Sequence, residues 1–294
     1  MDLKDFNKLD LTELDKDLSE EQQKEWNAIY ASYRSNSLLT GRVAGMDINT
    51  LKIKNPKTGE NETVEINCLV IIGYRVKVLI PEKEIWFDEE TKRPPHVLRS
   101  MTGAMIDYVI TNVDRENDIC LASRRKAMSF RRYSFLKLTP EPGRKIECRV
   151  VAVGRTRLLV EAGGYDISLS PRDVSYAMLP DMRERYHAGE THAAVIKKYD
   201  KEKNALYISI KEAEPHPFDG ADLRHPVKSR RASFITGKYG GGVFCRLEDN
   251  LDCLCTYSAN QYDGDFQIND QVIVAVTKFN YTKKVIFGKI VARW

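Results

Sequence analysis

A short stretch late in the chain combines side chains that can hold single-stranded nucleic acid. Lys238 and Tyr239 precede a run of glycines, and Phe244 and Arg246 follow it. Because alternate residues of a strand share a face, Phe244 and Arg246 are expected to point away from the apolar residues beside them. Aromatic rings stack on bases of any sequence, and cations bind phosphates with release of counterions. The pattern predicts a binding face. The alternatives are that Phe244 packs on a neighbouring domain and that Tyr239 caps the end of the β-barrel that such strands would form.

Further cations could extend such a face. Arg155 and Arg157 are two residues apart on a predicted strand, so they share a face and either follow a nucleic-acid backbone or pair with carboxylates. Arg230 and Arg231 follow a proline-containing segment and are additional candidates. Charge runs of this kind are most often solvated surface. The remaining basic clusters are Arg124–Lys126 and Arg131–Arg132.

No combination of residues indicates catalysis or metal binding. The five histidines lack the spacing of metal-ligand motifs, and no Gly-x-Ser-x-Gly elbow occurs. The run Gly240–Gly242 lacks the lysine of a phosphate-binding loop and predicts a tight turn or a bulge. The six cysteines form no Cys-x-x-Cys pair, and Cys253 and Cys255 share a strand face, which favours packing in a core. We therefore expect no enzyme activity, no catalytic residue, no metal and no cofactor.

The elements that would position these residues recur three times. Segments that begin at Gly103, Gly189 and Asn269 each run through a strand, reach Asp or Asn eleven residues later and continue into a second strand. Each segment is predicted to be a hairpin, with further short strands before it. In the first copy these strands are predicted at 38–44, 50–54, 62–69 and 76–80, around a polar excursion at 55–61. About five short strands per copy favour a small closed or nearly closed barrel, because closure removes exposed sheet edges.

The sequence thus predicts an all-β protein of three tandem five-stranded barrels, with a short N-terminal helix and a helical linker. In chain order we expect an acidic arm, a first barrel, a basic helical linker, a second barrel, a proline-containing linker and a third barrel. The corresponding ranges are 1–37, 38–126, 127–143, 144–214, 215–227 and 228–294.

The N-terminal arm differs in charge from the rest of the chain. Residues 1–25 hold nine acids against four lysines, so this segment is −5 and the remaining 269 residues sum to +9. A helix predicted over residues 20–33 places Trp26, Ile29 and Tyr33 on one face, against the first barrel or a partner. The N-terminus lacks a signal-peptide apolar region, and no 18-residue apolar run occurs. We expect a cytoplasmic protein without membrane contact.

Several segments match one known module. Gly41–Val43 forms an opening Gly-x-Val strand, Tyr239–Cys245 an aromatic-glycine strand, Cys253–Ser258 a third strand, and Asp200–Lys211 an Asp turn leading into Ile-x-Ile. They resemble the RNA-binding domain of the small-subunit ribosomal protein S-one family, an OB-fold barrel. The resemblance covers almost the whole chain after the N-terminal arm. It implies binding of single-stranded RNA, a link to translation, and a contact at Thr256, where the family usually has histidine.

The resemblance is uneven between the copies. Arg155 and Arg157 stand where the family has aromatics in the second copy, and the first copy lacks the aromatic pair as well. The expected partners are single-stranded RNA, in particular mRNA, and the small ribosomal subunit through the N-terminal arm or the first domain. The alternative is an OB-fold scaffold for protein interactions with weak or no RNA binding.

Overall fold

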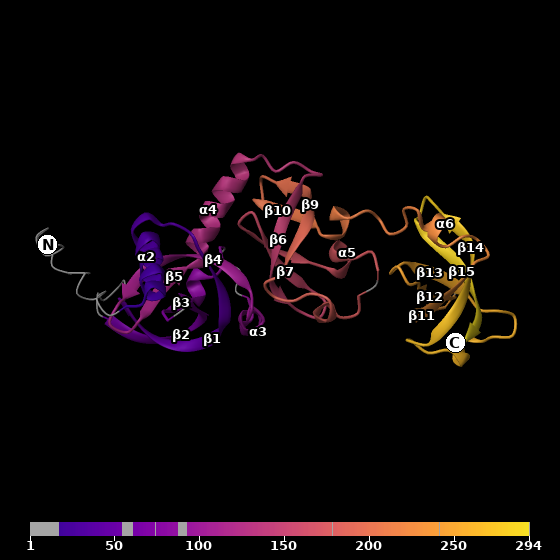
Figure 1. Ribbon diagram of the computed structural model, residues 1–294, viewed down its shortest axis with the longest axis horizontal. Helices are drawn as coiled ribbons and strands as arrows, with labels where there is room; N and C mark the ends of the chain where they lie inside the picture. The colour runs from indigo at the N-terminus through magenta and orange to yellow at the C-terminus, as the bar shows by residue number, and fades with distance from the viewer. Residues whose placement is uncertain are drawn as a thin grey trace, which may run out of the picture.

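Three five-stranded sheets follow one another along the chain (Figure 1). The computed structural model describes residues 18–54, 61–73, 75–87, 93–177, 179–240 and 242–293, with only the backbone for residues 51–54, 61, 62 and 64. Residues 1–17 of the acidic arm and residues 55–60 of the polar excursion lie outside the described residues. In the described part, no helix is long and apolar enough to cross a membrane.

The first sheet is a closed barrel with the strand order β1-β2-β3-β5-β4. Strands β3 and β5 pair in parallel and the other neighbours are antiparallel, which is the topology of the OB fold. The strands predicted at 38–44 and 50–54 are one continuous strand, because β1 pairs with β2 along its length as far as Lys54. The strands are β1 (Leu39–Lys54), β2 (Asn61–Ile72), β3 (Lys77–Pro81), β4 (Met105–Asp114) and β5 (Ile119–Ser123).

The third sheet repeats this topology. It closes in the order β11-β12-β13-β15-β14, again with one parallel pair, here β13 with β15. Its interior is filled by apolar side chains and by Cys245, Cys253 and Cys255, all fully buried, as the cysteine spacing predicted. The strands are β11 (Arg230–Tyr239), β12 (Gly242–Arg246), β13 (Asp252–Thr256), β14 (Gln271–Asn280) and β15 (Val285–Arg293).

The second sheet has the expected five strands and forms a nearly closed barrel, in which the pairing of strands leaves one gap. Its order is β10-β9-β6-β7-β8, with β10 and β8 at the edges. A short helix takes up the hydrogen bonds that would close it: the carbonyl of Asp173 accepts from the amide of Ile210 and the hydroxyl of Ser209, at the end of β10. The strands are β6 (Lys145–Val153), β7 (Leu158–Ala162), β8 (Tyr165–Leu169), β9 (Thr191–Asp200) and β10 (Ala205–Ser209).

The three copies share one turn that confirms their equivalence. Gly103, Gly189 and Asn269 each have a positive φ, of 89°, 94° and 74° respectively. The amide of each donates 2.8 Å to a carbonyl of the first strand of its own sheet, at Val43, Val150 and Ile235. Only glycine and asparagine adopt this backbone conformation readily. The repeat seen in the sequence is therefore a structural repeat.

Helices cap and join the sheets. Helix α2 places Trp26 and Ile29 in the first core, but Tyr33 is 48% exposed, which corrects the prediction that all three share the packed face. Ser32 takes the buried position instead, where its hydroxyl accepts from the amide of Ile110. The helices are α2 (Glu20–Ser35), α3 (Pro95–Arg99), α4 (Arg124–Lys137), α5 (Pro171–Val174) and α6 (Ala221–Arg224), and the 3-10 turns are η2 (Glu82–Glu84), η3 (Met182–Glu184), η4 (Lys211–Ala213) and η5 (Asp263–Asp265).

Candidate nucleic-acid interface

A row of aromatic and aliphatic side chains crosses the outside of the third barrel. The strand register places Phe244 beside Leu254, Leu254 beside Phe287, and Phe287 beside Lys278. Their neighbours along each strand, such as Cys245 and Cys253, point into the core, so alternation sends this row outward. Phe244 is 38% exposed, which is high for a large ring on a barrel.

Tyr239 extends this row at the end of β11. Its ring centroid lies 5.4 Å from that of Phe244 at an interplanar angle of 38°, and Tyr239 is 44% exposed. The two rings remain close because the intervening turn returns through Gly242. A side chain at Gly242 would collide with the carbonyl of Cys255, so glycine is a steric requirement at this position. We call Tyr239, Phe244, Leu254 and Phe287 the aromatic face.

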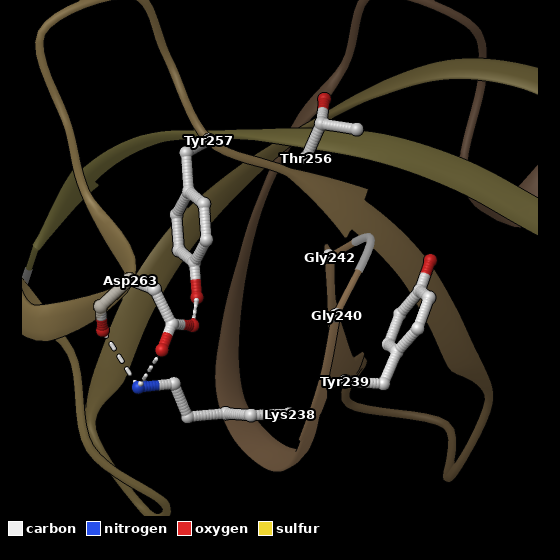
Figure 2. Close-up of a pocket in the computed structure, with 7 residues that line it drawn as sticks. All are labelled: Lys238, Tyr239, Gly240, Gly242, Thr256, Tyr257 and Asp263. Atoms are coloured by element: carbon white, nitrogen blue, oxygen red, sulfur yellow. Dashed lines mark hydrogen bonds and ion pairs between the residues drawn. The ribbon is translucent and has the colours of Figure 1, made fainter.

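An open hollow of about 670 Å³ lies beside Tyr239. Figure 2 shows Tyr239 on one side of this hollow and the phenol of Tyr257 on the other, with Thr256 at the rim. The residues that line it are Lys238, Tyr239, Gly240, Gly242, Thr256, Tyr257 and Asp263. Its shape and aromatic wall suit a flat ring of the size of a nucleobase.

Lys238 is held by the protein itself. Its Nζ donates to the carbonyls of Asp263 (2.6 Å) and Phe266 (2.8 Å) and lies 3.0 Å from the carboxylate of Asp263 (Figure 2). The Tyr257 hydroxyl donates to the same carboxylate at 2.5 Å. Burial and this bond raise the pKa of Tyr257 above its ordinary value, and the bonds from Tyr257 and Lys238 lower the pKa of Asp263. Lys238 therefore fixes the loop around the hollow.

The other predicted arginines are dispersed. Arg246 pairs with Asp252 at 3.0 Å, which neutralises much of its charge. Arg230 and Arg231 begin β11, about 30 Å along the strand from Tyr239 at roughly 3.3 Å per residue. Arg155 and Arg157 lie in the turn between β6 and β7 and not on a strand, which corrects the strand assignment. The structure thus groups Lys238, Tyr239, Phe244, Arg246 and Thr256 in one barrel region and separates the four other arginines from it.

Two lysines that the sequence analysis did not select lie next to the aromatic face. Lys289 is exposed and is paired in register with Thr256. Lys278 is exposed, and its Nζ lies 4.9 Å from the ring centroid of Phe287. Their position follows from the parallel pairing of β13 with β15, which no local pattern reveals. One signal was available, because Lys289 stands where the other two copies have Ser123 and Ser209.

The corresponding surface of the second sheet is occupied by the protein itself. The bulge that sets Gly237 opposite Phe244 recurs in the second sheet, where it sets Ala152 opposite Leu159. Leu159 is therefore the counterpart of Phe244, and the pair Glu161–Asp166 is the counterpart of Arg246–Asp252. Arg124 on α4 donates to Asp166 at 2.6 and 2.8 Å, and its side chain is only 1% exposed. Arg149 donates to Glu161 at 2.8 Å. The counterpart of Phe244 is thus a buried leucine, and the two acids next to it bind arginines.

A second carboxylate joins the first barrel to this network. Asp107 on β4 accepts from Arg149 (2.6 and 3.0 Å), from Arg131 (2.7 Å) and from Thr40 (2.6 Å). Burial alone would raise the pKa of Asp107, but the hydrogen bonds from Arg149, Thr40 and Arg131 outweigh it and lower the pKa to about 2. Leu159 of β7 packs in the core cluster of the first barrel. The first barrel and α4 therefore cover this face.

The first barrel has an aliphatic version of the same row. Val70 pairs with Leu79, and Leu79 pairs with Leu121, in the register that Phe244, Leu254 and Phe287 follow in the third barrel. Val70 and Leu79 are 7% and 3% exposed and form a small cluster with the buried Cys68. Exposed aromatics at this position thus occur in the third copy and not in the other two.

The described residues contain no group of three or more histidine, cysteine or acidic side chains that could hold a metal ion. The cysteines are buried, and burial raises the pKa of the Cys148 thiol to about 12. A buried neutral thiol is a packing group and not a nucleophile.

The fold and this face define a tandem array of OB-type domains, with an exposed aromatic and basic surface on the third barrel. No family model matches the chain. The small ribosomal subunit protein bS1 of Coxiella burnetii is 24% identical over 236 residues, which is 79% of this chain and 38% of that protein. The bS1 protein of Pseudomonas aeruginosa is 21% identical over 66% of this chain and 36% of its own length. The chain is a distant relative of bS1, and it spans little more than a third of the length of these relatives.

Other similarities are more limited. A 4-hydroxy-3-methylbut-2-enyl diphosphate reductase of Clostridium tetani is 23% identical over 58% of this chain, and the match covers 28% of the reductase. Among solved structures, a multidomain protein with nucleic acid binding domains from Streptococcus pneumoniae covers 88% of this chain and 74% of that chain, at 12% identity and a TM-score of 0.21.

Proposed function

We propose that this protein binds single-stranded RNA, with mRNA as the expected ligand, and that the aromatic face of its third barrel is the principal contact. The observation that carries the proposal is the exposed pair of rings, Tyr239 and Phe244, beside Lys278 and Lys289. Exposing a large ring to water costs free energy, which is recovered when a partner covers the ring. Bases stack on such rings, while phosphates bind the neighbouring lysines.

The nine residues predicted from the sequence contribute unequally to this proposal. Tyr239, Phe244 and Thr256 face the ligand directly, and Lys238 and Arg246 hold the surrounding loop and strand through Asp263 and Asp252. The separated arginines would contact only a longer strand; these are Arg155, Arg157, Arg230 and Arg231. A cytoplasmic location and a link to translation belong to the proposal and are supported by the distant relation to bS1.

The test is a titration of a fluorescent U-rich RNA of about 20 nucleotides into the full-length protein. We expect Tyr239→Ala/Phe244→Ala to weaken binding at least about thirtyfold, because each stacked base contributes roughly 1–3 kcal/mol. The control is Tyr33→Ala/Leu223→Ala, which removes two exposed apolar side chains elsewhere. Equal affinity of the two variants would refute the assignment of the face.

A second candidate is a scaffold for protein contacts, in particular with the small ribosomal subunit. It is favoured by one observation, namely that the first two copies lack exposed aromatics at the corresponding positions. Co-sedimentation with small ribosomal subunits separates the candidates. A scaffold would retain full co-sedimentation when Tyr239 and Phe244 are replaced by alanine, whereas an RNA-mediated association would be lost with the RNA affinity.

A further inference from the structure

The outward face of α4 carries a second alternation of rings and lysines. Positions 126, 130, 133 and 137 are spaced by four, three and four residues, so they lie on one side of the helix. The residues are Lys126, Phe130, Tyr133 and Lys137, and all four are exposed. We call them the α4 stripe. It spans about 16 Å along the helix axis at roughly 1.5 Å per residue.

The opposite side of the helix explains why the stripe faces solvent. Ala127 and Met128 are buried, and Arg132 lies with its guanidinium 3.6 Å from the ring centroid of Phe87 and 4.1 Å from that of Tyr165. These contacts fix the rotation of the helix about its axis. The C-terminal half of α4 (magenta) extends beyond both neighbouring sheets (Figure 1). The stripe is thus held on a rigid element with nothing from the described chain packed over it.

The exposure of the two rings is unusual for a helix of this kind. Phe130 is 44% exposed and Tyr133 is 64% exposed. Both stand on a surface whose other side already supplies the packing of the helix, so the fold does not require them. Lys137 places its Nζ 4.3 Å from the ring centroid of Tyr133, which leaves the other side of the ring open.

The charge of the helix selects an anionic partner. Residues 124–137 contain six arginines and lysines and no acid. On the packed side the cations are compensated, Arg124 by Asp166, Arg125 by Glu84 and Arg131 by Asp107. On the stripe, by contrast, no ion pair with a carboxylate involves either lysine in the part of the chain that the structure describes. A convex helix face offers no groove for a peptide helix, but bases can stack on its separate rings.

We infer that the α4 stripe is a second binding surface for single-stranded RNA, with bases on Phe130 and Tyr133 and phosphates at Lys126 and Lys137. This inference rests on the proposed function, because it assigns a further part of the same RNA. It concerns different residues on a different element, so the two surfaces can be removed separately.

The experiment measures the affinity of the full-length protein for the 20-nucleotide U-rich RNA. It compares Phe130→Ala/Tyr133→Ala, Tyr239→Ala/Phe244→Ala, the four residues changed together, and Tyr33→Ala as a matched helix-surface control. We expect the α4 variant to weaken binding about tenfold relative to the control, and the combined variant to be weaker than either. Circular dichroism checks that each protein remains folded, which the exposure of these side chains leads us to expect.

A salt titration supplies the second measurement. Lys126→Gln/Lys137→Gln is expected to lower the slope of log affinity against log salt by about 1.4, because each phosphate contact with a single strand contributes roughly 0.7. If Phe130→Ala/Tyr133→Ala binds RNA within twofold of the control and the slope is unchanged, the stripe is not an RNA surface. A loss confined to the α4 variant, with the third-barrel variant unaffected, would support the stripe and overturn the proposed site in the third barrel. Absence of RNA binding by the wild-type protein at low salt would overturn both.

Discussion

The second sheet and the third barrel use equivalent positions in opposite ways. In the third barrel, Phe244 and Leu254 present an apolar, partly exposed surface. In the second sheet, the residue in the register of Phe244 is Leu159, which is buried in the core of the first barrel. The neighbouring Glu161 and Asp166 are held by arginines. One repeat therefore leaves its face exposed to solvent, and the other uses it in the contact between domains. Membership of a repeat does not by itself predict what that repeat binds.

The difference also separates buried from exposed cations. Arg124 is buried and bidentate to Asp166, so it is a structural group. The cations beside the aromatic face are lysines with exposed side chains. A buried ion pair costs desolvation and is worth keeping only when both partners are present. Mutations should therefore affect stability in the second sheet and affinity in the third barrel.

The largest effect is expected for Arg124→Ala. It leaves Asp166 as an unpaired charge under α4, and removing one partner of a buried pair costs about 3–5 kcal/mol of unfolding free energy. Urea unfolding measures this loss. The matched control is Arg183→Ala, which breaks an exposed Arg–Asp pair and should cost less than about 1 kcal/mol. Equal losses in the two variants would show that the seam between the first two domains is not held by this pair.

The next effect concerns affinity. Phe244→Glu removes a stacking ring from the third barrel and adds a charge that repels phosphate. We expect RNA affinity to fall about a hundredfold with little change in the unfolding transition. Phe244→Tyr should retain most of the affinity. A Glu variant that binds as tightly as the Tyr variant would contradict the comparison.

Acid should weaken the contact between the first barrel and the second sheet before it affects the aromatic face of the third barrel. The pKa of Asp107 is lowered to about 2 in the folded protein, so its contribution to stability is complete above the unfolded pKa, near 3.8, and is lost as the pH falls toward 2. A pKa shift of this size corresponds to about 2 kcal/mol of unfolding free energy. The difference in unfolding free energy between the wild type and Asp107→Asn should therefore shrink between pH 5 and pH 2. A constant difference over this range would show that the carboxylate is not the stabilising group.

The smallest effect is expected for Lys289→Ser, which gives the third barrel the residue found at this position in the other two copies. We expect affinity to fall only a few-fold, and the salt slope to fall by about 0.7, because one phosphate contact is lost. Lys283→Ser, in the exposed turn between β14 and β15, is the control for net charge. The same slope change in both variants would mean that Lys289 acts through net charge alone.

Local patterns predicted the repeated hairpins and the outward direction of Phe244. Both follow from short-range rules, namely the Asp or Asn turn and the alternation of a strand. The gap in the second barrel could not be located in this way, because it depends on hydrogen bonds between Asp173 and the end of β10. Tyr33 was predicted to be packed, but the buried position belongs to Ser32. The hydroxyl of Ser32 accepts a hydrogen bond from the amide of Ile110 on β4, a contact that also depends on the fold.

The site was predictable only where it is local in sequence. Lys238, Tyr239 and Phe244 lie within seven residues of one another. Phe287 and Lys289 join them through parallel pairing across thirty or more residues, which requires the fold. The sequence predicted that Arg246 points away from the core. Its pairing with Asp252 was not predictable, because it depends on the register of β12 with β13.

Photo-crosslinking tests directly whether the RNA lies on the aromatic face of the third barrel. The full-length protein is bound to a U-rich RNA that contains 4-thiouridine, irradiated, and digested for peptide mapping by mass spectrometry. We expect crosslinks at Tyr239 and Phe244. We expect none on β7 or β8, residues 158–169, where the equivalent face of the second sheet is covered. Crosslinks concentrated on β7 and β8, with the third barrel unlabelled, would contradict it.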